Sequence, residues 1–259
     1  YTSVNTLSLH DALPIWVCVG TTGRYRVDGE ANSTYTWYLT DPSGAVTTLP
    51  FTADTVFITW NMTPGAYLLS TIQHSQYSCD APIELGQILL FGQPLAYAGQ
   101  SALICETQPT YYLSDATAAY DSTRLWTTSG TGTFDNDTLV NPVYTPSAAD
   151  IANGSVILTF TVYGKEPCPV VSDSMILSIS RQAIADAGRD TTICQTSGSV
   201  ALPTANAVFA TSLSWTTSGT GVFVDPTVLN PVYIPSFADI TAGSVVLTLT
   251  ATSASPCAT

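Results

Sequence analysis

Six cysteines are the residues whose spacing in this chain most clearly predicts chemistry. They form three consecutive pairs with separations of 61, 63 and 63 residues. No Cys-x-x-Cys pair is present, and a zinc site usually needs such clustered ligands. The spacing predicts one disulfide in each of three domains, namely Cys18–Cys79, Cys105–Cys168 and Cys194–Cys257. Each bond would close a loop of about 60 residues, contribute roughly 3–4 kcal/mol, and require an oxidising, extracellular compartment.

Catalysis by a nucleophile and a base needs a side chain whose pKa lies near neutrality. Histidine is the usual choice, and the chain has only His10 and His74. His10 lies in a segment that is set aside below, and we expect His74 to be an exposed residue at a strand end. The sequence also lacks a phosphate-binding loop. We therefore predict that the chain is not an enzyme.

Acidic residues could support glycoside hydrolysis or bind a cation. Most of them are not kept between two internal repeats, since Asp115, Asp121, Asp135 and Asp137 align with Thr204, Ala210, Val224 and Pro226. Asp135-Asn136-Asp137 is the best calcium candidate and Asp186 with Asp190 a weaker one, but the other ligands of a calcium loop are missing. We predict solvated turns there, with no metal and no cofactor.

The overall charge excludes several classes of partner. Six basic and nineteen acidic residues give a net charge of −13. Nucleic acid and anionic membranes both select clustered Lys and Arg, so neither is an expected partner. No run of 18 apolar residues is present, which argues against membrane insertion.

A gapless internal repeat is the main organising feature of the sequence. Residues 96–170 and 185–259 align at an offset of 89, with 35 of 75 positions identical. The identical positions include Trp126 with Trp215 and the Thr-Thr-Ser-Gly-Thr-Gly that follows each. A repeat of this length predicts an array of small domains, which usually serves as a spacer, stalk or adhesive surface.

The first 15 residues are set aside from the fold. Thr6–Ile15 reads TLSLHDALPI, the translation of a common sequencing adapter, which indicates an artefact in a metagenomic assembly. An N-terminal extension with a short strand, in which Leu7 and Leu9 alternate with polar residues, is the alternative.

Period-two alternation predicts β-sandwiches. It is clearest in Val156–Val162 and in its counterpart Val245–Ala251. In the divergent first domain we expect strands at Tyr25–Val27, Tyr35–Leu39, Val56–Trp60, Ala66–Ile72 and Ile88–Phe91. The expected domains are 16–94, 95–182 and 183–259, and the third lacks a counterpart of the strand at Asp173–Ile179.

A single helical turn is expected in each repeat. Ser147 and Asp150 fit a cap at its start, as do Ser236 and Asp239, because a serine hydroxyl and an acid three residues later bind free amide groups. Trp126 and Trp215 are expected in the core, like the tryptophan of an immunoglobulin sandwich.

These strings together resemble a known family. Gly188–Cys194, WTTSGTGxF, NPVYxPSxADI and GSVxLTLT resemble the PKD-like, immunoglobulin-type repeats of large surface proteins of Bacteroidota. Residues 16–94 are similar to a companion domain through Ser33–Trp37 and Pro64–Tyr67. The resemblance implies an all-β fold of three tandem sandwiches, secretion, and a non-catalytic role as an adhesin, stalk or fibre subunit. A carbohydrate-binding or spacer array of a larger secreted enzyme is the alternative, with Tyr111, Tyr112 and Tyr120 as its one aromatic cluster.

Glycosylation is the sharpest chemical signal. Asn-x-Ser/Thr triplets occur at Asn32, Asn61, Asn136 and Asn153, but in a bacterial, Thr-rich chain they are mostly coincidental. The family resemblance implies O-linked sugar at Asp-Ser/Thr followed by a small or aliphatic residue. The best acceptors are Thr55, Thr138 and Ser174, with looser fits at Ser122 and Thr191, all expected in turns or at strand ends.

Self-association end to end is the expected partnership. A sandwich without its last strand exposes unpaired backbone groups, and a strand from another copy could cover them. Residues 1–15 are one candidate donor. The alternative is a sequence that stops before the strand is encoded.

Overall fold

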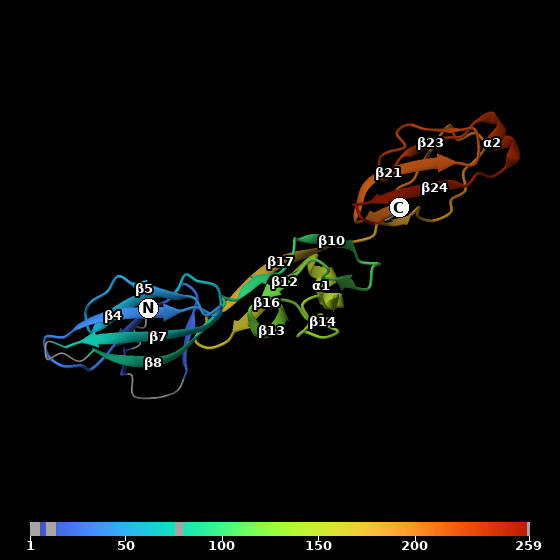
Figure 1. Ribbon diagram of the computed structural model, residues 1–259. Coiled ribbons are helices and arrows are strands. Elements are labelled where there is room, and N and C mark those ends of the chain that lie inside the picture. The colour runs from blue at the N-terminus through green and yellow to red at the C-terminus, as the bar shows by residue number, and fades with distance from the viewer. Residues whose placement is uncertain (1–5, 9–13, 76–79, 258–259) are drawn as a thin grey trace.

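Alternating apolar residues build three β-sandwiches, which follow one another in an extended row (Figure 1). The computed structural model describes residues 6–8, 14–75 and 80–257. Three separate clusters of buried apolar side chains surround Trp37 and Trp60, Trp126, and Trp215. The chain is therefore an all-β array of tandem immunoglobulin-like sandwiches, as predicted.

The first sandwich packs a five-stranded sheet on a three-stranded one. The larger sheet has the order β2-β8-β7-β4-β5, with bounds Ile15–Cys18, Asp80–Phe91, Gly65–His74, Thr34–Thr40 and Val46–Leu49. The smaller has the order β1-β3-β6, with bounds Thr6–Ser8, Thr22–Arg26 and Thr55–Thr59. Each of the five predicted strands overlaps one of these.

The N-terminal segment partly takes part in this fold. Strand β1 pairs in parallel with β3, which agrees with the alternative interpretation of a short strand for Thr6–Ser8. Ile15 pairs with Ile88 in the larger sheet, so the boundary between residues 15 and 16 divides a strand. Because Thr6–Ser8 and Ile15 pair inside their own domain, they do not form the expected donor strand.

The second sandwich shows the complete pattern of the repeat. Its main sheet has the order β10-β17-β16-β13, with bounds Ala102–Cys105, Val170–Ser180, Ser155–Gly164 and Asp121–Thr128. Strand β10 runs parallel to β17, and β16 runs antiparallel to it. The remaining strands are β11, β15 and β14 in one sheet and β9 with β12 in another, at Tyr111–Tyr112, Val143–Thr145, Thr133–Phe134, Leu95–Tyr97 and Thr117–Ala119.

In the described residues, the third sandwich forms only the part of that main sheet that corresponds to β13 and β16. Only β21 and β24 remain paired, at Ala210–Thr217 and Leu247–Ser253. The smaller sheets are kept, with β19, β23 and β22 in one and β18 with β20 in the other, at Val200–Ala201, Val232–Ile234, Val222–Phe223, Ile184–Asp186 and Asn206–Val208. Among the described residues, no strand occupies the slot beside β24 that β17 fills in the second domain.

Both predicted helical turns are confirmed. Helix α1 spans Ala148–Asn153 and α2 spans Phe237–Ala242, each with a serine capping box. Gly154 and Gly243 end them in the left-handed conformation, which a residue without Cβ adopts at little cost. None of the helices in the described part of the chain is long and apolar enough to cross a membrane.

The predicted pairing of the cysteines is wrong. The disulfides are Cys18–Cys168 and Cys105–Cys257, and each joins two neighbouring domains instead of closing one. Cys194 is a free, exposed thiol, and Cys79 lies outside the described residues. The equal spacing of the cysteines did not distinguish bonds within domains from bonds between neighbouring domains, because both patterns repeat once per domain. The predicted single disulfide in each domain is therefore corrected.

Candidate functional site

The junction between the first two domains is held by the main chain and by a disulfide. Cys18 ends β2 and Cys168 lies in the hairpin between β16 and β17, with their Cα atoms 5.1 Å apart. The Cys168 sulfur also lies 3.5 Å from the carbonyl oxygen of Gly92, in the linker itself. The Lys165 ammonium is 5.5 Å from the centre of the Phe91 ring. These contacts place the hairpin of the second domain against the end of the first.

The next junction repeats this arrangement. Cys105 ends β10 and Cys257 follows β24, with their Cα atoms 4.9 Å apart. Glu106 accepts a hydrogen bond from the backbone N–H of Gln182 at 2.7 Å, and Arg181 lies 3.4 Å from its other oxygen. A carboxylate of the second domain therefore fixes the linker, beside the disulfide.

A strained aromatic residue marks each junction. Tyr120 and Phe209 occupy equivalent places and have φ values of 55° and 59°, which are unfavourable for bulky side chains. The Tyr120 ring lies against Gly92, so that a Cβ at position 92 would collide with it. The Phe209 ring lies under the Arg181 guanidinium at 4.0 Å. Strain of this kind persists where surrounding contacts hold it, here at the domain boundaries.

The three tyrosines of the predicted aromatic cluster lie in different settings. Tyr120 belongs to the junction, whereas Tyr111 and Tyr112 form β11. Adjacent residues of a strand point to opposite faces. Accordingly, Tyr111 packs on the core and Tyr112 is exposed.

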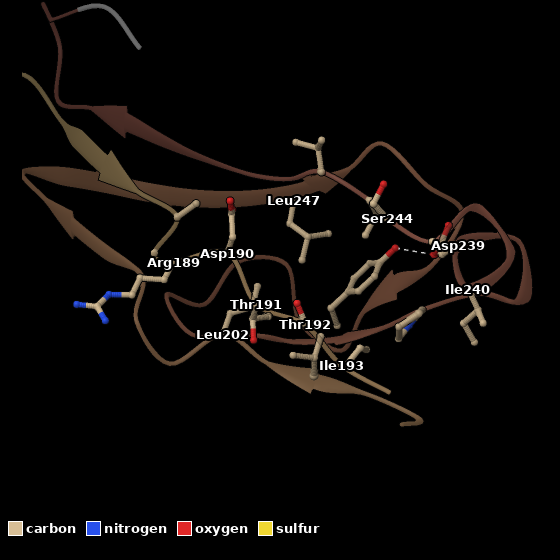
Figure 2. A pocket seen from close by; sticks show the side chains of 18 of the residues that line it. Arg189, Asp190, Thr191, Thr192, Ile193, Leu202, Asp239, Ile240, Ser244 and Leu247 are labelled. Carbon is tan, nitrogen blue, oxygen red and sulfur yellow. Dashed lines mark hydrogen bonds between the residues drawn. The ribbon is translucent and has the colours of Figure 1, made fainter. Parts of the chain in front are cut away.

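The third domain has an open groove where the second is closed (Figure 2). A cavity of about 660 Å³ lies between residues 187–195 on one side and 243–247 on the other. Ile193 is 38% exposed, whereas its counterpart Ile104 is 3% exposed. In the second domain this space is filled by Met175, Leu177 and Ile179 of β17, all buried. The groove thus lies in the place that β17 takes in the second domain.

Each repeat also contains one buried carboxylate with four donors. Asp150 accepts hydrogen bonds from the N–H groups of Thr131, Gly132 and Ser147 at 3.0 Å each, and from the Tyr144 hydroxyl at 2.8 Å. Asp239 repeats this set with Thr220, Gly221, Ser236 and Tyr233. The predicted helix cap is confirmed, but the carboxylate also ties down the Ser-Gly-Thr-Gly loop, which the capping argument did not foresee.

The hydrogen bonds around these carboxylates change their acidity. Burial opposes ionisation of Asp150, but the bonds from Ser147, Tyr144 and the loop outweigh it and lower its pKa. The pKa of Asp239 is lowered by the N–H groups of Ser236 and Thr220. Burial raises the pKa of Tyr144 to about 12. Because neither carboxylate has a basic partner among the described residues and each accepts four hydrogen bonds, the cluster is suited to fixing a loop, not to proton transfer.

His74 lies at the end of β7, as predicted, and contacts two potential catalytic partners. Its Nε2 is 2.8 Å from the Thr36 hydroxyl and its Nδ1 is 3.0 Å from Asp80. A hydroxyl, an imidazole and an acid in a row are the components of a hydrolase triad. However, the Asp80 and His74 side chains are 67% and 39% exposed, and none of the three residues lines the groove of the third domain. The group is better explained as a cross-strand polar contact.

Two of the candidate calcium ligands accept hydrogen bonds from the backbone. Asp135 accepts from the N–H groups of Asn136 and Val143, and Asp186 accepts from that of Gly188. In the described ranges no three histidine, cysteine or acidic residues are grouped as metal ligands.

The proposed glycan acceptors lie in different settings. Thr138 is in an exposed turn and bonds to Asn136, and Thr55 begins β6. Ser174 lies within β17, on its exposed side, not at a strand end as expected. Ser122 donates to Tyr163 and Gly164 at a β-bulge. Thr191 is exposed beside the groove.

Comparisons with known proteins give structural similarity only. The titin domains I67–I69 in an E-to-A mutated variant align with 92% of this chain and 94% of their own, at 12% identity and a TM-score of 0.49. The I-band fragment I67–I69 of titin aligns over 87% of both chains, at 14% identity and a TM-score of 0.47. Sidekick-1 immunoglobulin domains 1–4 align with 94% of this chain and 74% of their own, at 12% identity and a TM-score of 0.37. No protein-family model and no curated protein matches the chain. The fold assignment rests on the strand order above.

Proposed function

We propose that this chain is a non-catalytic structural segment of a secreted protein, in which cross-linked sandwiches form a stiff cell-surface stalk, adhesin or fibre subunit. The observation that carries the proposal is the second covalent link at each junction. Two domains joined by one linker normally move relative to each other. A disulfide beside the linker restricts that movement without adding to any binding pocket. It therefore supports a structural role better than a catalytic or ligand-binding role.

The expected location is outside the cell. Disulfides persist in oxidising compartments. Charged residues make up only 10% of the chain, and apolar side chains are exposed on its sheets. Together with the motif resemblance, this supports a PKD-like surface protein of Bacteroidota type. A carbohydrate-binding array remains the second candidate function, but the position of Tyr120 in a junction disfavours it.

End-to-end association of copies completes the proposed function. Successive sandwiches within the chain already stack end to end (Figure 1), and among the described residues no strand lies beside β24 in the position that β17 takes beside β16. Such an edge is a site for strand addition. We expect the occupant to alternate apolar and polar residues, as β17 does.

Electron microscopy of the purified chain tests the mechanical proposal. Oxidised protein should form straight rods three domains long, whereas protein treated with a reductant should bend at both junctions. Domain angles that are equally broad in oxidised and reduced samples would contradict a stiffening role.

O-linked sugar is the expected modification of native protein. Thr138 should be the most readily modified, because its hydroxyl is in an exposed turn, with Thr55, Ser174, Ser122 and Thr191 as further acceptors. The intact mass of protein from its native host should exceed that of the polypeptide, and Thr138→Ala should remove one increment. A native mass equal to the bare polypeptide would refute this.

A further inference from the structure

The third domain exposes an apolar surface on its smaller sheet where the second domain has a more polar one. Val222 on β22, Val224 just after it and Ile234 on β23 are 58%, 68% and 41% exposed. Phe237, the first residue of α2, is 85% exposed. We call these four residues the apolar patch. At an offset of 89, the second domain has smaller or more polar residues in all four places, namely Thr133, Asp135, Thr145 and Ala148.

The members of the apolar patch lie close together. Val222 pairs with Ile234 across the two strands. Val224 lies on the same face as Val222, because alternate residues of an extended chain point to the same side. The Thr220 and Ser236 hydroxyl oxygens are 2.6 Å apart, and this contact holds the start of α2 beside the start of β22. The four side chains therefore form one surface and are not isolated exposed residues.

The apolar patch is not needed to fold a domain of this kind. Strands β14 and β15 of the second domain pair in the same register as β22 and β23, and α1 begins with the same capping box as α2. The second domain does this with two threonines, an aspartate and an alanine in place of the patch. Apolar groups that stay in water add nothing to folding, and a contiguous group of them marks an interaction site.

A neighbouring domain in the row leaves this surface open. The second domain is followed by the third, and its four residues at the equivalent places are all exposed. The junction between these two domains is made elsewhere, by Cys105 with its disulfide and by Glu106, which holds the linker. The apolar patch therefore faces outward from the row of domains, where a separate molecule can reach it.

Charge favours a second copy of the chain as that molecule. Each copy has a net charge of −13, so copies repel each other wherever acidic groups meet. In a two-fold contact both partners use the same surface, and an acid near its centre would face another acid, which is unfavourable. Val224 stands where the second domain has Asp135, and the neighbouring Asp225 carboxylate accepts hydrogen bonds from Thr227 of its own turn. A basic partner would instead favour an acid at this place.

We propose that the apolar patch joins two copies of the chain side by side, through a two-fold contact between their third domains. An interface of standard size takes about 800 Å² from each partner and has an apolar centre and a polar rim. The patch supplies the centre, with Phe237 as its aromatic residue, and the hydroxyls of Thr220, Ser236 and Thr227 supply the rim. This lateral contact goes beyond the end-to-end association proposed above and does not depend on it.

Sedimentation velocity of the full chain at increasing concentrations tests the proposal. A Cys194→Ser parent prevents cross-linking through the exposed thiol, and it should show a monomer–dimer equilibrium. The patch variant replaces the four residues by those of the second domain, and its dimer should be weaker by at least about thirtyfold. Its fold should be unchanged in circular dichroism, because each new residue already occurs at the equivalent place of a folded repeat. The four changes are Val222→Thr, Val224→Asp, Ile234→Thr and Phe237→Ala.

Val208→Ala is the matched control. It also replaces an exposed apolar residue of the third domain by its counterpart in the second, Ala119, but it lies outside the apolar patch, so the dimer should keep its strength. End-to-end association would occur equally in the parent and in the patch variant, and the difference between the two therefore reports the lateral contact alone. A parent that stays monomeric, or a patch variant that dimerises as strongly as the parent, would overturn the proposal and leave the stalk function standing.

Discussion

Replacing Asp150 with asparagine is expected to lower the free energy of unfolding of the second domain by about 3 kcal/mol. The buried carboxylate accepts four hydrogen bonds. Asparagine has one acceptor oxygen in place of two, and its NH₂ group can only donate. The N–H or O–H groups that bonded to the replaced oxygen would therefore be buried without an acceptor. Hydrogen exchange of peptides from β13 and β16 measures the change in this domain separately from its neighbours.

The pH dependence of this effect has a defined sign. The folded-state pKa of Asp150 is lowered, so the ionised carboxylate stabilises the fold above its unfolded pKa of about 3.9. That contribution is lost as pH falls through the lower, folded-state value. The difference between wild type and Asp150→Asn should therefore be full at neutral pH and shrink in strong acid.

Asp137→Asn is the matched control, because it removes the same charge from an exposed turn and should change stability by less than about 0.5 kcal/mol. Equal effects of the two substitutions would show that net charge, not the buried hydrogen bonds, accounts for the loss.

Removing the second disulfide with Cys105→Ser and Cys257→Ser is expected to destabilise the joined domains by up to about 5 kcal/mol. This estimate follows from the loop that the bond closes, with a sequence separation of 152, in the chain-entropy description. The third domain should lose most, because only Ala205, Trp215 and Leu249 form its buried cluster. Replacing both cysteines avoids leaving a thiol that could exchange with Cys194.

Calorimetry combined with hydrogen exchange of β21 and β24 measures this loss, and Cys194→Ser is the control that removes a cysteine without breaking a bond. If the double variant unfolded at the wild-type temperature in both domains, the cross-link would have no structural role.

Much of the fold follows from local sequence. Val156–Val162 alternates strictly, and it forms the central part of β16. Ser147 and Asp150 cap α1 as their spacing requires, and Trp126 is buried as expected. These features depend on neighbouring residues, so the sequence contains the information directly.

The junctions depend on how separate domains meet, and local patterns do not specify this. The equal spacing of the cysteines fits bonds within domains and bonds between them equally well. The sequence predicts Tyr120 as a member of an aromatic cluster, whereas Tyr120 and its counterpart Phe209 both lie at domain boundaries. The repeat register was the one available signal. It shows that each domain has a first and a second cysteine at equivalent positions, but it does not determine which cysteines are adjacent in space.

The disulfide pattern tests the central claim most directly. Free thiols are blocked, the oxidised chain is digested with trypsin without reduction, and linked peptides are identified by mass spectrometry. Cleavage after the basic residues separates the four relevant peptides, 1–24, 27–124, 166–181 and 190–259. Bonds between domains predict that 1–24 is linked to 166–181 and that 27–124 is linked to 190–259. Linkage of 1–24 to 27–124, of 27–124 to 166–181, and a bond internal to 190–259 would show three separately closed domains and contradict the cross-linked stalk.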